Sequence, residues 1–343
     1  MGIERRYFSP RNEIARRRGR CAQHIEMAPE VRTERSHVAR GTPRIIRMTS
    51  LSERPTTHFF SVDVEEYFQV NAFESIVSRD RWLAYPSRVA RSVDDLLDTL
   101  SRRGVRGTFF TLGWIAQHRP GVVRAIAAAG HEIASHGFWH QRVPTLSARE
   151  FREDVRQSKA LLEDVVGAEV LGYRAPSFSI IRGTEWAFDV LIEEGYRYDS
   201  SLFPIRRRGY GYASACRSPH WIQRPSGQIA EFPLATLRYG PLSIPAAGGG
   251  YLRQFPLAVI RRAFADATAR REPATFYVHP WEIDDGQPRL PVSALTRVRH
   301  YRGLRRTHER IDTLLREFNF DCIASHLDAL DGPVRTLELA GVA

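Results

Sequence analysis

The stretch His58-Phe59-Phe60-Ser61-Val62-Asp63 is a short apolar run that ends on an acid. Four similar runs follow, separated by amphipathic segments, at residues 107–112, 132–135, 170–173 and 274–278. This alternation is typical of βα units and predicts a parallel sheet. Four of the five runs stop on an ionisable residue, namely Asp63, His136, Arg174 and His279. Functional side chains gather where strands end, both in a (β/α) barrel and in a doubly wound sheet, so we expect these four to converge.

Amphipathic segments with helix-start and helix-stop signals lie between the runs. We expect helices near residues 93–102, 122–129, 147–166, 184–194 and 307–318. The third is the best marked, because Glu150 stands at capping-box distance from Ser147 and a glycine follows the last periodic residue. Residues 203–273 contain many Gly, Pro and Arg residues and are expected to form long surface loops, with a strand beginning at Glu231.

The composition indicates a globular protein with a charged tail. With 343 residues and 43% hydrophobic content, the chain can bury a core as one large α/β domain or two smaller ones. A net charge of +11 can indicate nucleic-acid binding, but its distribution along the chain argues against this. Residues 1–47 hold twelve Arg and five Glu, a net +7, which leaves +4 for the rest. We therefore expect a disordered Arg-rich tail without a function, with Met48 as an alternative start. A transit peptide or an RNA-binding arm is the alternative for the tail, and we expect no nucleic-acid partner for the folded part.

The chain lacks the sequence signals of membrane insertion and secretion. No stretch approaches the roughly 18 consecutive apolar residues of a membrane helix, and the N-terminus has no apolar signal region. We accordingly expect a cytoplasmic protein. The cysteines Cys21, Cys216 and Cys322 are odd in number and lack metal-type spacing, so a disulfide framework is not indicated.

The histidines His136 and His140 are separated by three residues and directly follow a predicted strand. Two imidazoles at this spacing can face one cation when the segment turns like a helix, although a structural pair fits the spacing equally well. The acidic cluster 63–66 could supply a third ligand, with one carboxylate on the metal and another accepting a proton from water. An acidic loop or helix N-terminus is the alternative for that cluster.

Arg174 and His279 complete the set of ionisable residues at strand ends. Arg174 could hold a catalytic carboxylate in a bidentate pair, and Pro176 beside it indicates a fixed loop. His279 is a candidate general acid for a leaving amine. A surface arginine and a structural histidine are the alternatives, in a chain with 49 Arg against one Lys.

In their order along the chain, these motifs resemble the polysaccharide deacetylases of carbohydrate esterase family 4, which share the nodulation-type chitooligosaccharide deacetylase domain. The stretches Ser-Val-Asp-Val-Glu-Glu at 61–66, Tyr-Arg-Ala-Pro-Ser at 173–177 and Val-His-Pro-Trp-Glu at 278–282 are similar to an exosortase-associated subgroup found with exopolysaccharide gene clusters. The resemblance covers about residues 58–320. It implies an α/β fold, a distorted (β/α) barrel of about seven parallel strands. The domain boundaries we expect are a catalytic domain at 48–330, with tails at 1–47 and 331–343.

The resemblance also implies a metal site and a base. Asp63 matches the family's catalytic base, and Glu65, His136 and His140 match its ligands for one divalent ion, with Zn²⁺ favoured over Co²⁺, Ni²⁺ or Mn²⁺. A valine separates Asp63 from Glu65 where the commoner family pattern has two adjacent aspartates. The division between base and ligand therefore stays open, with Glu66 as a further candidate.

Four more positions match functional residues of the family. Arg174 matches the arginine that orients the base, and His279 matches the acid that protonates the departing amine. Asp199, at the start of an Asp-Ser-Ser motif, matches the acid that orients this histidine. The backbone N–H of Ser177 stands where the family places an oxyanion donor.

The implied activity is metal-dependent hydrolysis of N-acetyl groups on N-acetylhexosamine units of a bacterial exopolysaccharide or its precursor. The implied partners are an N-acetylated oligo- or polysaccharide and the exopolysaccharide assembly machinery. One alternative is a metal-dependent amidohydrolase acting on a cyclic ureide or imide, which a small closed pocket would favour. The other is an inactive glycan-binding assembly protein, against which the intact set of acids, histidines and arginine argues.

Overall fold

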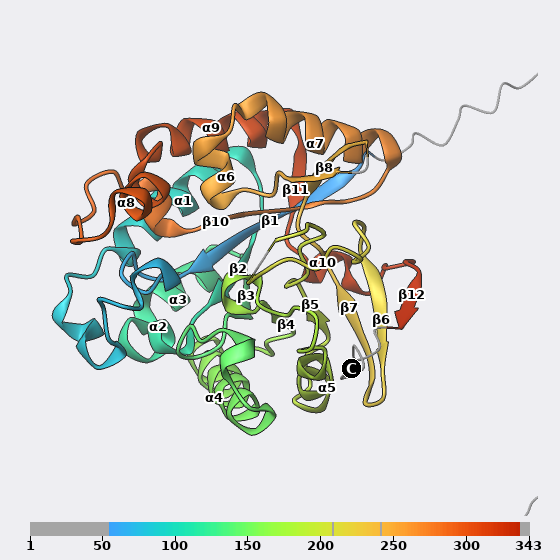
Figure 1. The fold of residues 1–343 in the computed structure, drawn as a ribbon, viewed down its shortest axis with the longest axis horizontal. Helices are drawn as coiled ribbons and strands as arrows, with labels where there is room; N and C mark the ends of the chain where they lie inside the picture. The colour runs from blue at the N-terminus through green and yellow to red at the C-terminus, as the bar shows by residue number, and fades with distance from the viewer. Residues whose placement is uncertain (1–54, 208, 241, 337–343) are drawn as a thin grey trace, which may run out of the picture. The chain divides into compact units, whose positions relative to one another are not determined.

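In the computed structural model, residues 55–207, 209–240 and 242–336 are described, and the predicted tail at 1–47 lies outside them. The main sheet has the order β10-β1-β2-β3-β4-β5-β7-β6-β12, and β11 pairs with β1 (Figure 1). Its strands are β1 Thr57–Val64, β2 Thr108–Thr111, β3 Glu132–Ser135, β4 Gly172–Tyr173, β5 Tyr198–Asp199, β6 His220–Arg224, β7 Gly227–Glu231, β10 Thr275–Val278, β11 Asn319–Asp321 and β12 Val334–Thr336. A separate hairpin joins β8 (Thr236–Tyr239) to β9 (Leu242–Pro245).

Seven strands of this sheet, from β10 through β7, are joined by parallel pairs in the manner of a barrel. Among the described residues β7 and β10 form no ladder with each other, and the chain just beyond β7 approaches β10 at an isolated bridge between Leu234 and Thr275. The predicted α/β fold with a distorted barrel of about seven parallel strands is therefore confirmed. The barrel is not closed by a strand ladder.

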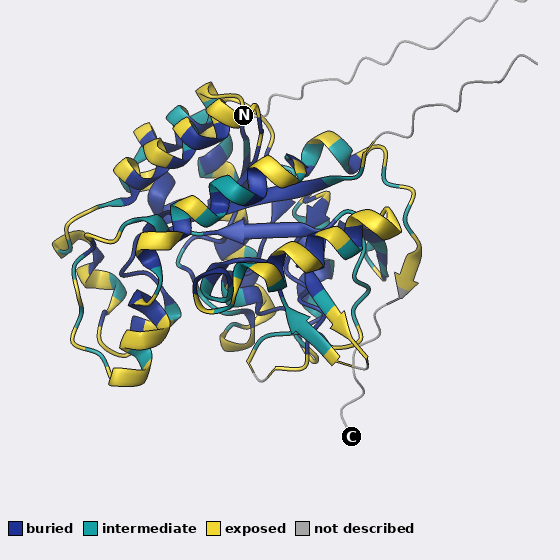
Figure 2. Cartoon of the chain, turned by 90° about the horizontal axis from the view of Figure 1, so that it is seen from above, coloured by how far each residue is buried: buried dark blue, intermediate teal, exposed yellow. Residues whose placement is uncertain are grey.

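Helices follow most of the parallel strands, as the sequence pattern predicted. They are α1 Val89–Arg103, α2 Gly113–His118, α3 Pro120–Ala128, α4 Ala148–Val166, α5 Trp186–Glu193, α6 Gly249–Gln254, α7 Leu257–Arg270, α8 Ala294–Tyr301, α9 Leu304–Glu317 and α10 Ala324–Leu327. The capping box predicted for α4 is present, with the Ser147 side chain accepting from the Glu150 N–H and the Glu150 carboxylate accepting from the Ser147 N–H. Figure 2 shows the buried strands covered by helices whose outer faces are exposed.

The barrel strands are buried on both faces, because helices cover the outer face and the inward side chains pack against one another. Seven of the eight residues of β1 are buried, and all four residues of β2 and of β10 are buried. Near-continuous apolar strands of this kind are expected for parallel sheets. No helix in the described part of the chain is long and apolar enough to cross a membrane.

The prediction of long loops over residues 203–273 holds for the described residues that precede β6, which form no helix or strand, and is wrong from β6 onward. This region holds the antiparallel pair β6 and β7, the hairpin of β8 and β9, and helices α6 and α7. Glu231 ends a strand rather than beginning one. The β6 sequence His-Trp-Ile-Gln-Arg alternates buried and half-buried residues and carries several polar side chains, so it does not appear as an apolar run. In the predicted C-terminal tail, β12 pairs with β6.

Candidate active site

Three potential metal ligands converge at the carboxyl ends of the strands. Glu65 follows β1, His136 follows β3, and His140 lies four residues further on. One ligand atom from each lies within 4.8 Å of the others, and all three residues are buried. His140 Nε2 is 2.8 Å from Glu65 Oε2. Ligands about 2.0–2.2 Å from one tetrahedral ion are about 3.3–3.6 Å apart. The ligand atoms here are separated by distances from 2.8 Å up to at most 4.8 Å, a range that includes the spacing required by a zinc-like cation.

The chemistry of these three groups also fits a cation. Glu65 Oε2 is buried and has no hydrogen-bond partner among the described residues, although it faces His140 Nε2. Burial raises the pKa of Glu65, but the surrounding histidines, above all His140, outweigh burial and lower the pKa to about 2. Burial also holds the pKa of His136 well below its usual value. An ionised carboxylate and a neutral imidazole are the forms that bind metal.

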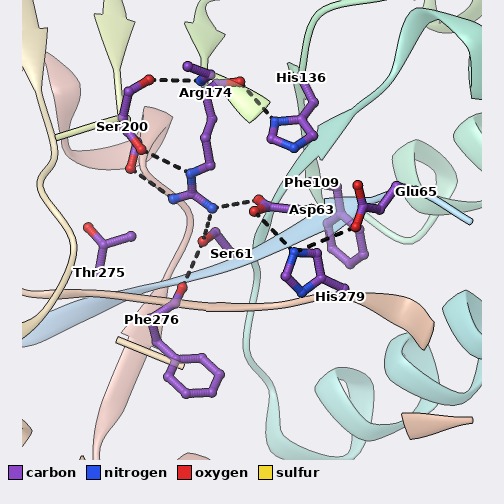
Figure 3. A network of polar contacts seen from close by, with 12 residues as sticks. Ser61, Asp63, Glu65, Phe109, His136, Arg174, Ser200, Thr275, Phe276 and His279 are labelled. Carbon is purple, nitrogen blue, oxygen red and sulfur yellow. Dashed lines mark hydrogen bonds and ion pairs between the residues drawn. The ribbon is translucent and has the colours of Figure 1, made fainter. Parts of the chain in front are cut away.

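The ring of His136 is oriented by the backbone of the next strand end. Its Nδ1 lies 2.8 Å from the carbonyl oxygen of Arg174, to which it donates (Figure 3). A donor at Nδ1 leaves the Nε2 lone pair free to accept a cation. The pairing of β3 with β4 brings these two residues together.

The turn between the two histidines is held by Asp154 on α4. Its carboxylate accepts hydrogen bonds from the backbone N–H groups of Phe138, at 2.8 Å, and Trp139, at 3.2 Å. Gly137 adopts a left-handed φ of 73°, and a Cβ there would lie 2.6 Å from Asp154 Oδ2. The turn therefore requires glycine. Sequence analysis did not identify Asp154.

Asp63 is held by a fully buried arginine. Arg174 Nη1 donates to Asp63 Oδ1 at 2.6 Å and to Ser61 Oγ at 2.8 Å. Its other nitrogens donate to the Ser200 side chain and carbonyl, which lie beyond the end of β5 (Figure 3). With four fixed contacts, the guanidinium has a single orientation and positions the Asp63 carboxylate at the floor of the site. The predicted contact between Arg174 and a carboxylate of the acidic cluster is present, but it is not bidentate, because the other guanidinium nitrogens bind Ser200.

His279, which follows β10, lies beside Asp63 and Glu65 (Figure 3). Its Nε2 is 3.9 Å from Asp63 Oδ2 and 3.7 Å from Glu65 Oε1, and its Nδ1 is 2.9 Å from Glu282 Oε2. Burial lowers the pKa of His279, but the hydrogen bond and charge of Glu282, with the other two carboxylates, raise the pKa to about 9. The imidazole is thus held in its protonated form at neutral pH.

Glu282 takes the place that sequence analysis gave to Asp199. Asp199 Oδ1 accepts from the Ser201 hydroxyl at 2.7 Å, and Asp199 neighbours Glu231 on the adjacent strand. The expectation that Asp199 orients His279 is therefore corrected, because Asp199 ends β5 and its carboxylate is bound locally there. The i,i+3 spacing of His279 and Glu282 was the available signal.

Glu282 is itself paired with an arginine. Arg253 Nε donates to Glu282 Oε1 at 2.6 Å, and both side chains are almost fully buried. Burial raises the pKa of Glu282, but Arg253 and His279 outweigh burial and lower the pKa to about 2. Arg253 Nη1 also donates to the carbonyls of His300 and Arg302. Arg253 and Glu282, both buried, form a continuous row with the partly exposed His279, which ends at the site.

The contacts of Glu65 and Glu66 show which carboxylates of the acidic cluster 63–66 belong to the site. Trp281 Nε1 donates to Glu65 Oε1 at 3.0 Å, so the segment that carries His279 also orients Glu65. Glu66, the further candidate from the sequence, accepts from the Ser87 hydroxyl and the Arg88 N–H and is not among the residues that line the cavity. The site therefore contains two carboxylates of the cluster, Asp63 and Glu65.

The cluster opens into a cavity of about 420 Å³. Asp63, Glu65 and the three histidines 136, 140 and 279 line its floor. Aromatic side chains line the walls, namely Phe178, Tyr210, Tyr251, Tyr277 and Trp281. Ser177, at the edge, has a left-handed φ of 55°. An apolar cavity with a few convergent polar groups is the usual form of a ligand site.

The fold and the site define an α/β-barrel protein with a two-histidine, one-carboxylate cluster at its strand ends. Two family models match the chain: "Polysaccharide deacetylase" over residues 82–193 and "Domain of unknown function (DUF3473)" over residues 200–328. Residues 82–193 are therefore similar to polysaccharide deacetylases, and residues 200–328 are similar to DUF3473. The first match contains His136, His140 and Arg174, whereas Asp63 precedes it and His279 lies in the second.

Curated relatives share part of this chain. A peptidoglycan deacetylase from Helicobacter pylori is 27% identical over 107 residues, which are 31% of this chain and 36% of the relative. A chitooligosaccharide deacetylase from Sinorhizobium fredii is 33% identical over 98 residues, or 28% of this chain and 43% of the relative. The matches thus span less than half the length of either relative.

A solved structure confirms the fold. It comes from Mycobacterium smegmatis and is provisionally described as a polysaccharide deacetylase. It is 19% identical to this chain, with a TM-score of 0.57, and the alignment covers 84% of this chain and 96% of that one. At this level of identity the likeness establishes the barrel architecture alone.

Proposed function

We propose that this protein is a metal-dependent deacetylase that hydrolyses the acetamide of N-acetylhexosamine units in a bacterial exopolysaccharide or its precursor. The observation that carries the proposal is the convergence of Glu65, His136 and His140 with Asp63 and His279 on one cavity. The match to the polysaccharide deacetylase family model and the glycan deacetylases among the relatives of this chain support the same reaction. We propose a catalytic domain that starts near residue 48 and extends past residue 330, because β12 pairs with β6.

Glu65, His136 and His140 would hold one divalent ion, with Zn²⁺ the first candidate. The buried Glu65 oxygen that lies 2.8 Å from His140 Nε2 supports this assignment. When bound, such an ion supplies Lewis acidity to the acetamide carbonyl and the attacking water. Trp281 and the carbonyl of Arg174 act through these ligands, since each fixes the orientation of one of them.

Two side chains move the protons. Asp63, fixed by Arg174, accepts a proton from the attacking water. His279, kept protonated by Glu282, donates a proton to the nitrogen of the departing amine. The separation of 3.9 Å between Asp63 Oδ2 and His279 Nε2 in the absence of substrate is short enough for both to reach the reacting bond.

The walls of the cavity suit a carbohydrate. Sugar rings have apolar faces, and side chains such as Tyr251 and Trp281 offer flat apolar surface together with a polar group. The Tyr210 and Tyr251 hydroxyls are 2.5 Å apart, so this wall is held by a hydrogen bond. The N–H of Ser177, at the edge of the cavity, is assigned to the oxyanion that forms on the acetyl carbonyl.

The experiment for this proposal measures acetate release. Purified protein loaded with Zn²⁺ is incubated with N-acetylated chitooligosaccharides, with a cyclic imide as the alternative substrate. We expect acetate from the oligosaccharides, loss of release with a chelator, and recovery on adding Zn²⁺. Ring opening of the imide without acetate release would instead support the amidohydrolase alternative. No turnover of either substrate by metal-loaded protein would support the inactive glycan-binding alternative.

A further inference from the structure

The mouth of the cavity is bordered on one side by a basic and apolar helix. Thr296 and Arg299 of α8 line the cavity together with Asn71 and Ala72 of the neighbouring turn. That turn packs against α8, because the ring of Phe73 lies 4.5 Å from the ring of His300. Whatever binds the outer surface of α8 therefore lies beside the entrance to the site.

Large apolar side chains on this surface face solvent. Leu295 is 59% exposed and Val298 is 51% exposed. Ile76, just beyond the turn that packs on α8, is 43% exposed. Residues three, four and seven apart share a helix face, so Leu295 and Val298 lie with Arg299 and Arg302 on one side of α8. Arg306, at the start of α9, lines a cavity together with Arg302. We call Leu295, Val298, Arg299, Arg302 and Arg306 the α8 surface.

The α8 surface also carries positive charges that no carboxylate neutralises in the described part of the chain. Residues 289–310 contain seven Arg and one Glu. In the described part of the chain, the side chains of Arg299, Arg302 and Arg306 form no ion pair with a carboxylate, whereas Arg305 pairs with Asp285. Arg302 and Arg306 line a second cavity, of about 660 Å³, next to the buried Arg253.

We propose that the α8 surface docks on an anionic phospholipid bilayer and so presents the mouth of the cavity to the membrane surface. Exposed Leu and Val side chains can enter the boundary between headgroups and acyl chains, while arginines pair with lipid phosphates. A free phosphate would account for the arginines but not for the exposed Leu295 and Val298. A bilayer accounts for both.

Docking there would bring the site to a glycan carried on a lipid. That consequence rests on the proposed function, whereas the docking itself does not. A bilayer bound to the α8 surface would lie next to the cavity, because Arg299 belongs to both. The substrate class is then an N-acetylated saccharide linked to a membrane lipid.

The test is flotation of the full-length protein with vesicles. Phosphatidylcholine vesicles, with and without phosphatidylglycerol, are compared at low and high salt. We expect binding to the anionic vesicles that weakens with salt, and little binding to the neutral ones. The double variant Arg302→Gln/Arg306→Gln should bind about 25-fold more weakly, from about fivefold for each arginine. The double variant Leu295→Asn/Val298→Asn should bind the anionic vesicles at least about tenfold more weakly.

Arg124→Gln/Arg149→Gln is the matched control, since both residues are exposed and lie on α3 and α4. This control removes two positive charges, as Arg302→Gln/Arg306→Gln does. Every variant keeps the basic residues at 1–47. Unchanged affinity in the α8 variants, or an equal loss in the control, would overturn the proposal. Acetate release from soluble oligosaccharides should be the same in all variants. Vesicle binding without any deacetylation would refute the proposed function and leave the docking intact.

Discussion

Glu282 Oε2 lies 2.9 Å from Nδ1 of His279, and the two residues are three positions apart in the turn that follows β10. The opposite oxygen of Glu282 is bound by Arg253, so the carboxylate has one orientation. His279 consequently presents Nε2 to the site, on the side of Asp63 and Glu65. The DUF3473 region, which contains all three residues of this row, is thereby an integral part of the site.

Replacing Glu282 with Gln should impair protonation of the leaving group. General acid catalysis contributes about 10²- to 10⁴-fold, so we expect amide hydrolysis to fall at least about 100-fold. Hydrolysis of 4-nitrophenyl acetate should change little, because nitrophenolate leaves without a proton. His279→Ala should show the same selectivity, and Glu309→Gln, an exposed site on α9, should behave as wild type. An equal loss on both substrates would indicate a structural role only.

The same pair predicts how stability depends on pH in metal-free protein. The pKa of His279 is raised from 6.5 to about 9, so folding favours the protonated form. This stabilisation is fully present below about pH 6.5 and is lost as pH rises through about 9. It corresponds to roughly 3 kcal/mol, from about 1.4 kcal/mol for each pKa unit. Urea unfolding at about pH 6 and about pH 10 should show this loss in wild type and a smaller one in His279→Gln.

Asp63→Asn should abolish turnover and leave the metal bound. Asparagine keeps the size of the side chain and can still accept from Arg174, but it is not a base. We expect acetate release to fall by about 10²- to 10⁴-fold while metal content stays unchanged. Metal analysis and kinetics on the same preparation provide the check. Loss of the metal in Asp63→Asn would mean that Asp63 is the ligand and Glu65 the base.

Asp154→Ala should weaken metal binding although Asp154 touches no ligand side chain. Its carboxylate holds the turn between His136 and His140, and losing such support typically costs about 10- to 100-fold in metal affinity. Competition with a chromophoric chelator would measure the affinity. Asp164→Ala, an exposed site on the same helix, is the control. Equal affinities in the two variants would contradict the assigned role.

The sequence pattern predicted the barrel because buried parallel strands appear as apolar runs. The run that ends at Asp63 became β1, and the runs before His136 and His279 became β3 and β10 with boundaries within a residue or two. Their order also placed the ionisable residues at one face, since parallel strands end together. The convergence of Asp63, Glu65, His136, His140 and His279 was therefore predictable.

Contacts that depend on packing were not predictable in the same way. Asp154 is one of several polar residues on an amphipathic helix, and its capping of the turn after His136 depends on where α4 packs. Arg253 lies 29 residues before Glu282, on a helix that the Gly-rich sequence did not indicate. Asp199 satisfied a motif but was bound locally by Ser201.

Metal content of the purified protein decides whether the cluster of Glu65, His136 and His140 is a metal site. Elemental analysis after dialysis against Zn²⁺ should give about one equivalent for the wild type, and circular dichroism should confirm that the variants fold. The variant His136→Ala/His140→Ala should retain none, and His118→Ala, whose ring stacks on Trp114, should retain the full equivalent. Equal metal content in wild type and the double variant would contradict the assignment.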